Sequence, residues 1–300
     1  MPENISPQPA ISESLAYQTQ AQPFLKWAGG KRQLLPVIKT YLPAQYQEYY
    51  EPFVGAGAVF LALQPHKSTI NDTNSELVNC YQVIKERPQA LLDLCQQHQA
   101  NNSKEYYYQL RQQDRQPDFL QRSGVERAAR IIYLNKTCFN GLYRVNRQGQ
   151  FNVPYGKYKQ PTIANPQVIK AIATYLNRAQ VEILNTDFER AVSSAQPGAF
   201  IYFDPPYHPL SSTSSFTGYS QQKFGETEQI RLKQLGDRLS DNGCQVLISN
   251  SAAPFIEDLY SDRRYKLVRV QATRAINNVS SKRGKIDEVL IYNRYPLAGS

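Results

Sequence analysis

The sequence predicts an α/β fold: a Rossmann-like, seven-stranded mixed sheet with helices on both faces and a helical insert at about residues 76–164. Two observations predict this fold. A strand, a glycine turn and a helix follow one another between Tyr49 and Leu63, and this succession is typical of the opening of a nucleotide-binding α/β unit. Short apolar runs separated by helical stretches then recur, as is expected of buried parallel strands.

The expected strands form two blocks. They are Tyr49–Phe53 and Ser68–Asp72 in the first block, and Gln180–Leu184, Ala199–Phe203, Gln245–Asn250, Tyr265–Val270 and Glu288–Tyr292 in the second. Helical spacing of apolar residues predicts helices at 34–41, Val59–Leu63 and Asn74–Lys85. Residues 1–20 are polar and lack an apolar period, which predicts a disordered tail.

The segment between the two blocks has a different pattern. From about Tyr81 to Tyr133 the periods are helical, with many glutamines and arginines, and this predicts a helical subdomain. The following stretch, from Asn135 to Pro161, is rich in Gly, Tyr, Lys and Arg and predicts a hairpin or an extended loop. It has too few apolar residues to form a core of its own.

The composition favours a polyanionic partner. The chain has 34 Lys and Arg against 25 Asp and Glu, a formal net charge of +9. Its 21 tyrosines and 12 phenylalanines are interleaved with cations, and such rings can stack on bases while the cations hold phosphates. The alternative is that most of the rings fill cores.

Other classes of protein are disfavoured. The four cysteines form no C-x-x-C pair and have only three histidines beside them, so neither a zinc site nor a disulfide framework is expected. No apolar run approaches the roughly 18 residues that span a bilayer, and no signal-peptide pattern is present. We expect a cytoplasmic protein with no metal, no membrane partner and a monomeric state.

The D-P-P-Y sequence Asp204-Pro205-Pro206-Tyr207 is the first candidate site. It directly follows an expected strand, at the carboxyl end where open α/β sheets bind ligands. Two prolines remove two backbone donors and fix a rigid turn with free carbonyls. A carboxylate, a free carbonyl and an adjacent ring suit a planar group that bears an amine. The alternative is a tight turn with a capping aspartate.

The glycine turn Glu51–Gly57 is the second candidate, since its glycines let the backbone approach a cofactor closely. Asp72, at the end of the next strand, is placed to accept hydrogen bonds from ribose hydroxyls; a helix N-cap is the alternative. Gly29-Gly30-Lys31 suggests a phosphate loop, but Arg32 follows the lysine and the spacing fails. An NTPase is therefore disfavoured.

Five motifs, in order, closely resemble those of the Dam-like DNA adenine methyltransferases of the alpha group, and the resemblance covers roughly residues 23–293. The motifs are Phe24–Lys31 (FLKWAGGK), Glu51–Phe60 (EPFVGAGAVF), Asn135–Arg144 (NKTCFNGLYR), Phe151–Tyr158 (FNVPYGKY) and Asp204–Tyr219 (DPPYHPLSSTSSFTGY). The resemblance implies methyl transfer from S-adenosylmethionine to the N6 amine of adenine in duplex DNA. It makes 76–164 the target-recognition domain, and 21–75 with 165–300 the methyltransferase domain.

The family pattern implies roles for individual residues. The catalytic group is Asp204, Pro205, Pro206 and Tyr207: the carboxylate and the Pro205 carbonyl accept hydrogen bonds from the amine, and Tyr207 stacks on a flipped base. The implied cofactor-binding residues are Trp27, Ala28, Gly29, Lys31, Glu51, Phe53, Gly55, Asp72 and Asp204.

The resemblance also implies a DNA-contacting set. Its members are Lys26, Phe139, Asn140, Leu142, Arg144, Pro154, Lys157 and Tyr158. Arg144 corresponds to an arginine that reads a guanine edge, for which a bidentate guanidinium is suited. Phe139 stands where the family places an aromatic that inserts into the base stack; many members have Tyr there, so Phe139 keeps the stacking face and loses a hydroxyl.

Two other functions stay open at this point. The D-P-P-Y type of turn also serves RNA bases and protein amides, and a catalytically silent DNA-binding protein could use the same scaffold. The basic, aromatic insert argues for duplex DNA, and the intact Asp204, Tyr207, Trp27 and Lys31 argue for an active enzyme. The motifs in the insert, with the run 209–213, resemble the GATC-specific branch. A solitary enzyme and a member of a restriction-modification pair are both compatible with the sequence.

Overall fold

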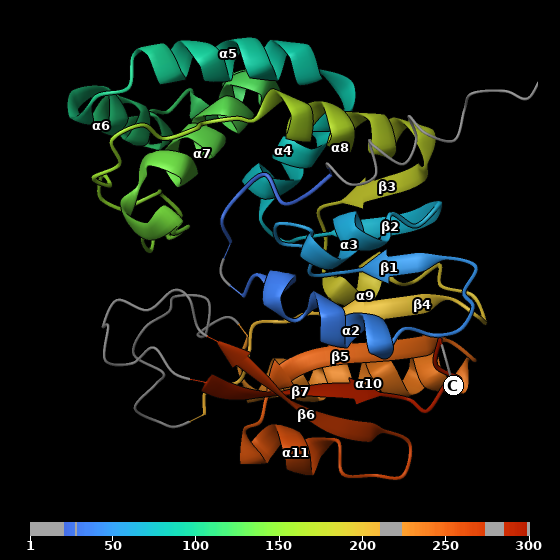
Figure 1. Ribbon diagram of the computed structural model, residues 1–300. Coiled ribbons are helices and arrows are strands. Elements are labelled where there is room, and N and C mark those ends of the chain that lie inside the picture. The colour runs from blue at the N-terminus through green and yellow to red at the C-terminus, as the bar shows by residue number, and fades with distance from the viewer. Residues whose placement is uncertain (1–20, 28, 211–223, 274–284, 299–300) are drawn as a thin grey trace, which may run out of the picture.

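A seven-stranded mixed sheet runs through the molecule in the order β3-β2-β1-β4-β5-β7-β6 (Figure 1). The computed structural model describes residues 21–27, 29–210, 224–273 and 285–298. The strands are β1 Tyr49–Glu51, β2 Lys67–Asn71, β3 Gln180–Leu184, β4 Phe200–Phe203, β5 Gln245–Ser251, β6 Lys266–Thr273 and β7 Lys285–Tyr292. The prediction of an α/β fold with a mixed sheet is confirmed.

Strand direction and burial follow from the apolar runs. Strands β1 to β5 pair in parallel, whereas β7 is antiparallel to both of its neighbours, β5 and β6. All four residues of β4 are buried, because a central parallel strand is covered on both faces. The chain order reverses between β1 and β4, and open sheets bind ligands at the carboxyl ends of the strands at such a reversal.

The described residues form helices before the first strand and between later strands. The α-helices are α2 Leu35–Thr40, α3 Ala58–Leu63, α4 Ser75–Glu86, α5 Pro88–Ala100, α6 Lys104–Gln112, α7 Gly124–Thr137, α8 Pro166–Arg178, α9 Phe188–Ala191, α10 Glu226–Asp241 and α11 Pro254–Leu259. The 3₁₀ turns are η1 Lys31–Gln33, η2 Gln113–Arg115, η3 Phe119–Gln121 and η4 Phe139–Gly141. No described helix is long and apolar enough to cross a membrane.

Side chains at the helix starts explain several of these boundaries. Asn74 caps α4 by accepting hydrogen bonds from the backbone N–H groups of Glu76 and Leu77. Helix α7 begins with a capping box between Ser123 and Glu126, in which each side chain accepts from the other residue's backbone. Polar caps of this kind satisfy the amides that have no partner in the first turn.

Two cores cover the two faces of the sheet. One packs Tyr50, Ile201 and Phe203 against α10 and α11. The other packs the opposite face against α3, α4 and α8 and continues into α5, α6 and α7, which lie beyond the β3 edge in Figure 1. Helix α4 packs against both α7 and α8, so the domain boundary expected at residue 76 falls in the first turn of a helix that both parts share. The division into domains stays a prediction.

Some expected boundaries were wrong. Strand β1 ends at Glu51, and Phe53 lies in the turn that follows it, because the backbone leaves the sheet there to form the glycine turn. Helix α7 continues to Thr137, so the first residues of the stretch expected to be a loop are helical. Residues 138–161 contain two isolated antiparallel bridges, Cys138 with Tyr155 and Val145 with Phe151, and the turn η4. This is the hairpin-like loop that the composition predicts.

Candidate active site

Asp204 lies directly after β4, at the carboxyl edge of the sheet. Its Oδ1 is 2.8 Å from Lys31 Nζ, and the side chains of the two residues are 18% and 5% exposed, respectively. Lys31 Nζ also donates to the Gly29 carbonyl at 2.7 Å. Burial raises the pKa of Asp204 to about 6, against the opposing effect of the Lys31 cation, and the negative charge of Glu288 adds to the rise. Asp204 is therefore an ionised hydrogen-bond acceptor at neutral pH.

Tyr207 is held at two places. Its ring centroid lies 4.5 Å from Lys31 Nζ, and its hydroxyl donates to Glu288 Oε2 at 2.8 Å. Burial raises the pKa of Tyr207 well above its usual range, so the hydroxyl keeps its proton and remains a donor. Lys31 thus contacts both Asp204 and Tyr207, and it fixes the carboxylate relative to the ring.

The two proline carbonyls of the turn differ. The Pro206 carbonyl accepts from Gln229 Nε2 at 2.9 Å, whereas no hydrogen bond among the described residues uses the Pro205 carbonyl. Gln229 is fully buried on α10, and its Oε1 accepts from Asn250 Nδ2 at 3.0 Å. The Asn250 Oδ1 in turn accepts from the backbone of His208 at 3.1 Å.

Sequence reasoning missed Gln229 and Asn250, which clamp the D-P-P-Y turn from α10 and β5. The available signal was a polar run, Ser249 to Ser251, directly after the apolar run Val246 to Ile248 of the same strand. Ser251 Oγ donates to the His208 carbonyl at 2.6 Å. Buried polar groups are costly unless they are paired, so a polar strand end marks a place where the strand fixes something else.

The glycine turn lies between β1 and α3. Gly55 and Gly57 have φ angles of 51° and 71°, in the left-handed region that glycine adopts without strain. The Gly55 N–H donates to Asp72 Oδ2 at 3.1 Å, and the Asn74 N–H donates to Asp72 Oδ1 at 2.9 Å. Each carboxylate oxygen thus has one backbone partner and a second lone pair, while the cap of α4 is Asn74 rather than Asp72.

Trp27 joins this turn to the insert. Its ring stacks on Tyr143 with centroids 4.6 Å apart and planes at 27°. A Cβ on Gly55 would lie 3.1 Å from Trp27 Cδ1, so the tryptophan covers the turn closely. Trp27 and Lys31 therefore link the insert, the glycine turn and Asp204 within one short segment.

The remaining residues of the expected cofactor set have different surroundings. Glu51 is 2% exposed, and its Oε2 accepts from the Tyr49 hydroxyl at 2.6 Å. Burial raises the pKa of Glu51 to about 8, so at neutral pH it holds its proton. Phe53 packs on Phe188 and Phe224, with centroids 5.4 and 5.5 Å away. Ala28 lies outside the described residues.

A buried amide joins the first motif to the loop between α7 and α8. Asn135 is fully buried; its Oδ1 accepts from the Lys26 N–H at 2.9 Å, and its Nδ2 donates to the carbonyls of Lys26 (2.8 Å) and Gly141 (3.0 Å). Lys26 Nζ lies 5.2 Å from the Tyr158 ring centroid. The hydrogen bonds of Asn135 bring Lys26 and the loop together. Asn135 is the first residue of the motif Asn135–Arg144, but no role was predicted for it from the sequence.

The expected DNA-contacting side chains lie on the loop between α7 and α8 and on Lys26. Those that are exposed are Lys26, Phe139, Arg144, Pro154 and Lys157. Phe139 is 44% exposed, and its N–H donates to the Pro154 carbonyl at 2.9 Å. Arg144 donates from Nε to Asn152 Oδ1 at 2.7 Å and from a terminal nitrogen to the Asn152 carbonyl at 3.3 Å. Leu142 and Tyr158 are half-buried, as is Asn140, whose φ is 56°.

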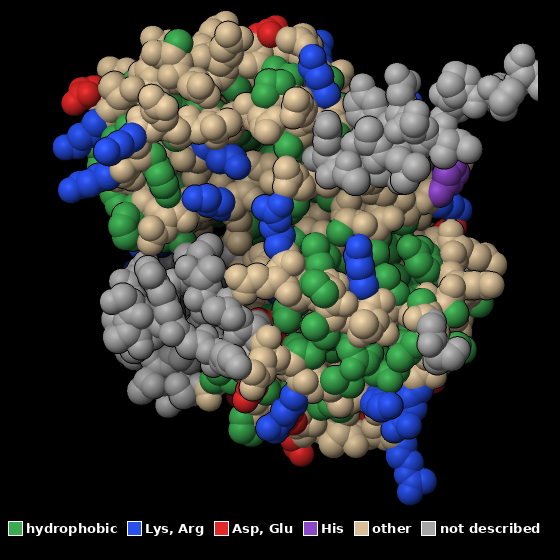
Figure 2. All heavy atoms as spheres, viewed as in Figure 1, with side chains coloured by type: hydrophobic (Ala, Val, Ile, Leu, Met, Phe, Trp, Pro, Cys, Tyr) green, Lys and Arg blue, Asp and Glu red, His purple; other side chains and the backbone are tan. Residues whose placement is uncertain are grey.

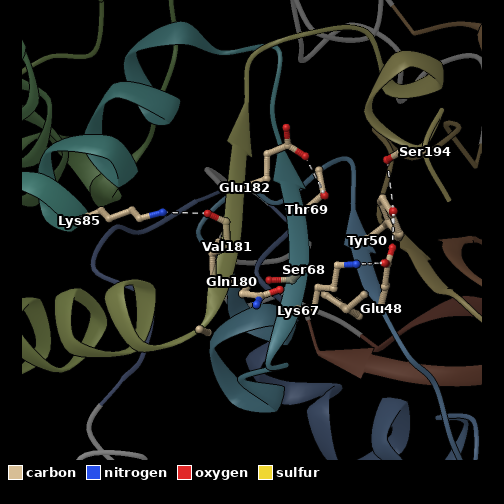
Figure 3. Close-up of a pocket in the computed structure, with 12 residues that line it drawn as sticks. Glu48, Tyr50, Lys67, Ser68, Thr69, Lys85, Gln180, Val181, Glu182 and Ser194 are labelled. Carbon is tan, nitrogen blue, oxygen red and sulfur yellow. Dashed lines mark hydrogen bonds and ion pairs between the residues drawn. The ribbon is translucent and has the colours of Figure 1, made fainter.

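Charge is unevenly distributed on the face shown in Figure 2, where Lys and Arg side chains outnumber Asp and Glu over the insert and the middle of the molecule. A depression of about 640 Å³ lies elsewhere, across β1, β2 and β3 (Figure 3). Its wall includes Glu48, Lys67 and Gln180, which lie at the amino ends of these strands, opposite the edge that carries Asp204. Lys67 and Glu48 form an ion pair in this wall, so the charges of these two residues neutralise each other.

The sheet order with an antiparallel β7, and a D-P-P-Y turn at the carboxyl end of β4, define an α/β protein of the S-adenosylmethionine-dependent methyltransferase type. The chain matches the family model of the D12 class N6 adenine-specific DNA methyltransferases over residues 27–276, and it belongs to this family. The resemblance predicted from the motifs is thereby confirmed. Adenine in DNA is the substrate of the family, and methyl transfer is its reaction.

Relatives agree with this assignment. The chain is 49% identical over 272 residues to the type II methyltransferase M1.LlaDCHI of Lactococcus lactis subsp. cremoris. The alignment covers 91% of this chain and 95% of the relative. It is 41% identical over 296 residues to the type II methyltransferase M.MjaIII of Methanocaldococcus jannaschii, with 91% and 99% covered. It is 37% identical over 275 residues to a DNA adenine methylase of Vibrio cholerae, with 89% and 94% covered.

Proposed function

We propose that this chain transfers the methyl group of S-adenosylmethionine to the N6 amine of adenine in duplex DNA, within the sequence GATC. The observation that carries the catalytic part is the group at the end of β4: Asp204 beside Lys31, the Tyr207 ring beneath the same lysine, and a Pro205 carbonyl unused by the described residues. We assign catalysis to Asp204, Pro205 and Tyr207, with Pro206 holding the turn through Gln229.

The glycine turn fits a nucleoside cofactor. Gly55 presents backbone without a side chain under the Trp27 ring, and Asp72 keeps a second lone pair on each oxygen for hydroxyl donors. When bound, S-adenosylmethionine supplies an electrophilic methyl group on a cationic sulfur. Asp204 beside Lys31 and Glu288 beside Tyr207 supply two carboxyl groups to the site, which suits a positively charged ligand.

The adenine amine is a weak nucleophile because its lone pair is delocalised into the ring. Asp204 and the Pro205 carbonyl accept its two N–H groups, which localises the lone pair and directs it away from the ring. Tyr207 stacks on the base with the face that Lys31 leaves free. A base held in this way must first leave the DNA stack, and Phe139, exposed on the recognition loop, is suited to fill the gap.

The experiment that tests the catalytic proposal measures transfer of a tritiated methyl group from S-adenosylmethionine to duplex DNA, RNA and protein extract. We expect transfer to duplex DNA only, and loss of it in Asp204→Ala with DNA affinity retained, because the carboxylate aligns the amine and holds no phosphate. Transfer to RNA or to protein in preference to DNA, or substantial turnover by Asp204→Ala, would reject the proposal.

The GATC proposal rests on the recognition loop. Arg144 can donate two hydrogen bonds to a guanine edge once it exchanges Asn152 for the base. Losing such a bidentate pair costs about 1–3 kcal/mol of discrimination. Arg144→Ala should therefore relax specificity at one guanine, whereas Lys157→Ala should weaken binding to all sequences and flatten its salt dependence. Single-molecule sequencing of methylated plasmid maps the modified adenines; modification outside GATC in the wild type contradicts this target.

A further inference from the structure

Glu288 lies on β7, far along the chain from the D-P-P-Y turn, yet it contacts that turn. Strand β7 pairs with β5, and Glu288 lies opposite Ser251 in this pairing, at the same end of the sheet as Asp204. From there its Oε2 accepts the Tyr207 hydroxyl at 2.8 Å. Neither a motif nor a matched family position drew attention to this glutamate in the sequence.

The contact fixes the one part of Tyr207 that Lys31 does not fix. Pro205 and Pro206 restrict the backbone before Tyr207, but its ring can still swing about the side-chain torsions. Lys31 lies over the ring face, 4.5 Å from the centroid, while Glu288 holds the far end of the side chain by its hydroxyl. Two contacts of different direction define the plane of the ring relative to Asp204.

We propose that Glu288 is a positioning residue for methyl transfer: its carboxylate holds the Tyr207 ring in the plane in which the target adenine stacks beside Asp204. This inference rests on the stacking role proposed for Tyr207. A hydrogen bond from a hydroxyl to a carboxylate is stronger than one between neutral groups, so the ring is held before the base arrives.

A glutamate with a purely structural role would have different surroundings from those of Glu288. Glu288 is half-buried rather than part of the core, and β7 is joined to β5 and β6 through its backbone. Removing the side chain leaves these strand pairings in place. Its neighbour Asp287 is exposed on the same strand and provides a matched control with the same change of charge.

The test is a double-mutant cycle on single-turnover methylation of duplex DNA at saturating cofactor, with Glu288→Ala, Tyr207→Phe and the double variant. Each single variant should slow the reaction about tenfold, the loss of one charge-assisted hydrogen bond, with little change in DNA affinity. The double variant should be no slower than either single one, because both remove the same bond. Multiplying effects, about a hundredfold together, would overturn the inference.

Three further variants complete the test. Glu288→Gln keeps an acceptor for the hydroxyl and should restore most of the rate lost in Glu288→Ala, whereas Asp287→Ala should leave the rate unchanged. Tyr207→Ala, which lacks the ring, should be slower than Tyr207→Phe. If Tyr207→Ala is impaired and Glu288→Ala is not, the role of Glu288 is rejected and that of Tyr207 stands. Full activity in Tyr207→Ala would reject both.

Discussion

Lys31 sets the charge balance of the active site. Its ammonium pairs with Asp204 at 2.8 Å, lies over the Tyr207 ring and is almost fully buried. Burial raises the pKa of Asp204 to about 6 and that of Glu51 to about 8, and Lys31 opposes both shifts. At pH 7 the site therefore has an ionised Asp204 and a protonated Glu51. The two carboxyl groups therefore differ in protonation because their surroundings differ.

The pKa of Asp204 predicts an acid limb in the activity of the enzyme. Only the ionised carboxylate accepts a hydrogen bond without donating one, so kcat/KM should rise with pH through about 6. In Lys31→Met the cation that lowers this pKa is absent, and the limb should move to higher pH. The measurement is a pH profile of initial methylation rates at low DNA concentration. Lys39→Met, which removes an exposed lysine of α2, is the control; a limb that stays in place in Lys31→Met would contradict the electrostatic role.

Among the elements around the site, the glycine turn is covered by a helix that begins after the next strand. The glycine turn after β1 is covered by α4, whose Tyr81 hydroxyl donates to the Gly55 carbonyl at 3.0 Å. A Cβ on Gly57 would lie 2.5 Å from this hydroxyl oxygen. Gly57 is thus required twice, by its φ of 71° and by the approach of Tyr81.

Gly57→Ala should therefore cost more stability than the backbone strain alone would. Gly198 has a φ of 85° and no atom near its Cβ position, so Gly198→Ala measures the cost of left-handed backbone by itself, about 1–2 kcal/mol. Chemical denaturation should show a larger loss of stability for Gly57→Ala, and calorimetry should show weaker S-adenosylmethionine binding in that variant only. Adding Tyr81→Phe, which removes the hydroxyl, should recover part of the loss. Equal effects of the two alanines would mean that the contact with Tyr81 is unimportant.

The whole molecule has a core that does not stop where the insert begins. The cluster that covers one face of the sheet continues into the buried side chains of α5, α6 and α7, with Leu91, Tyr107 and Ile132 among them. Trp27 and Asn135 lie at the same junction, and both bridge the insert to the segment that leads to Lys31. The insert and the rest of the chain are therefore joined by packing as well as by the backbone.

This continuity predicts a single unfolding transition. Trp27 is the one tryptophan of the chain, so its fluorescence reports the junction, while far-UV circular dichroism reports all helices and strands. The two signals should have coincident midpoints in guanidinium chloride, and residues 76–164 expressed alone should not fold. An earlier transition in tryptophan fluorescence would show instead that the two parts separate before either unfolds.

The sequence by itself determined the elements and the position of the site within them. Apolar runs predicted all seven strands, and helical periods predicted the insert, because hydrophobic spacing follows the geometry of each element directly. It also placed the D-P-P-Y turn at a carboxyl strand end. The errors were at boundaries such as Phe53, where a backbone turn ends a strand that residue type alone would continue. Residues 211–219 of the last motif lie outside the described part of the chain.

Only the tertiary structure decided the partners. The pairing of Lys31 with Asp204, the clamp formed by Gln229 and Asn250, and the bond from Tyr207 to Glu288 join residues on different elements. Their proximity depends on the order of strands in the sheet, in particular on β1 beside β4 and on β7 beside β5. Local spacing specifies which face of an element is buried, but it does not specify which element lies next to it. That choice depends on the packing of the whole chain.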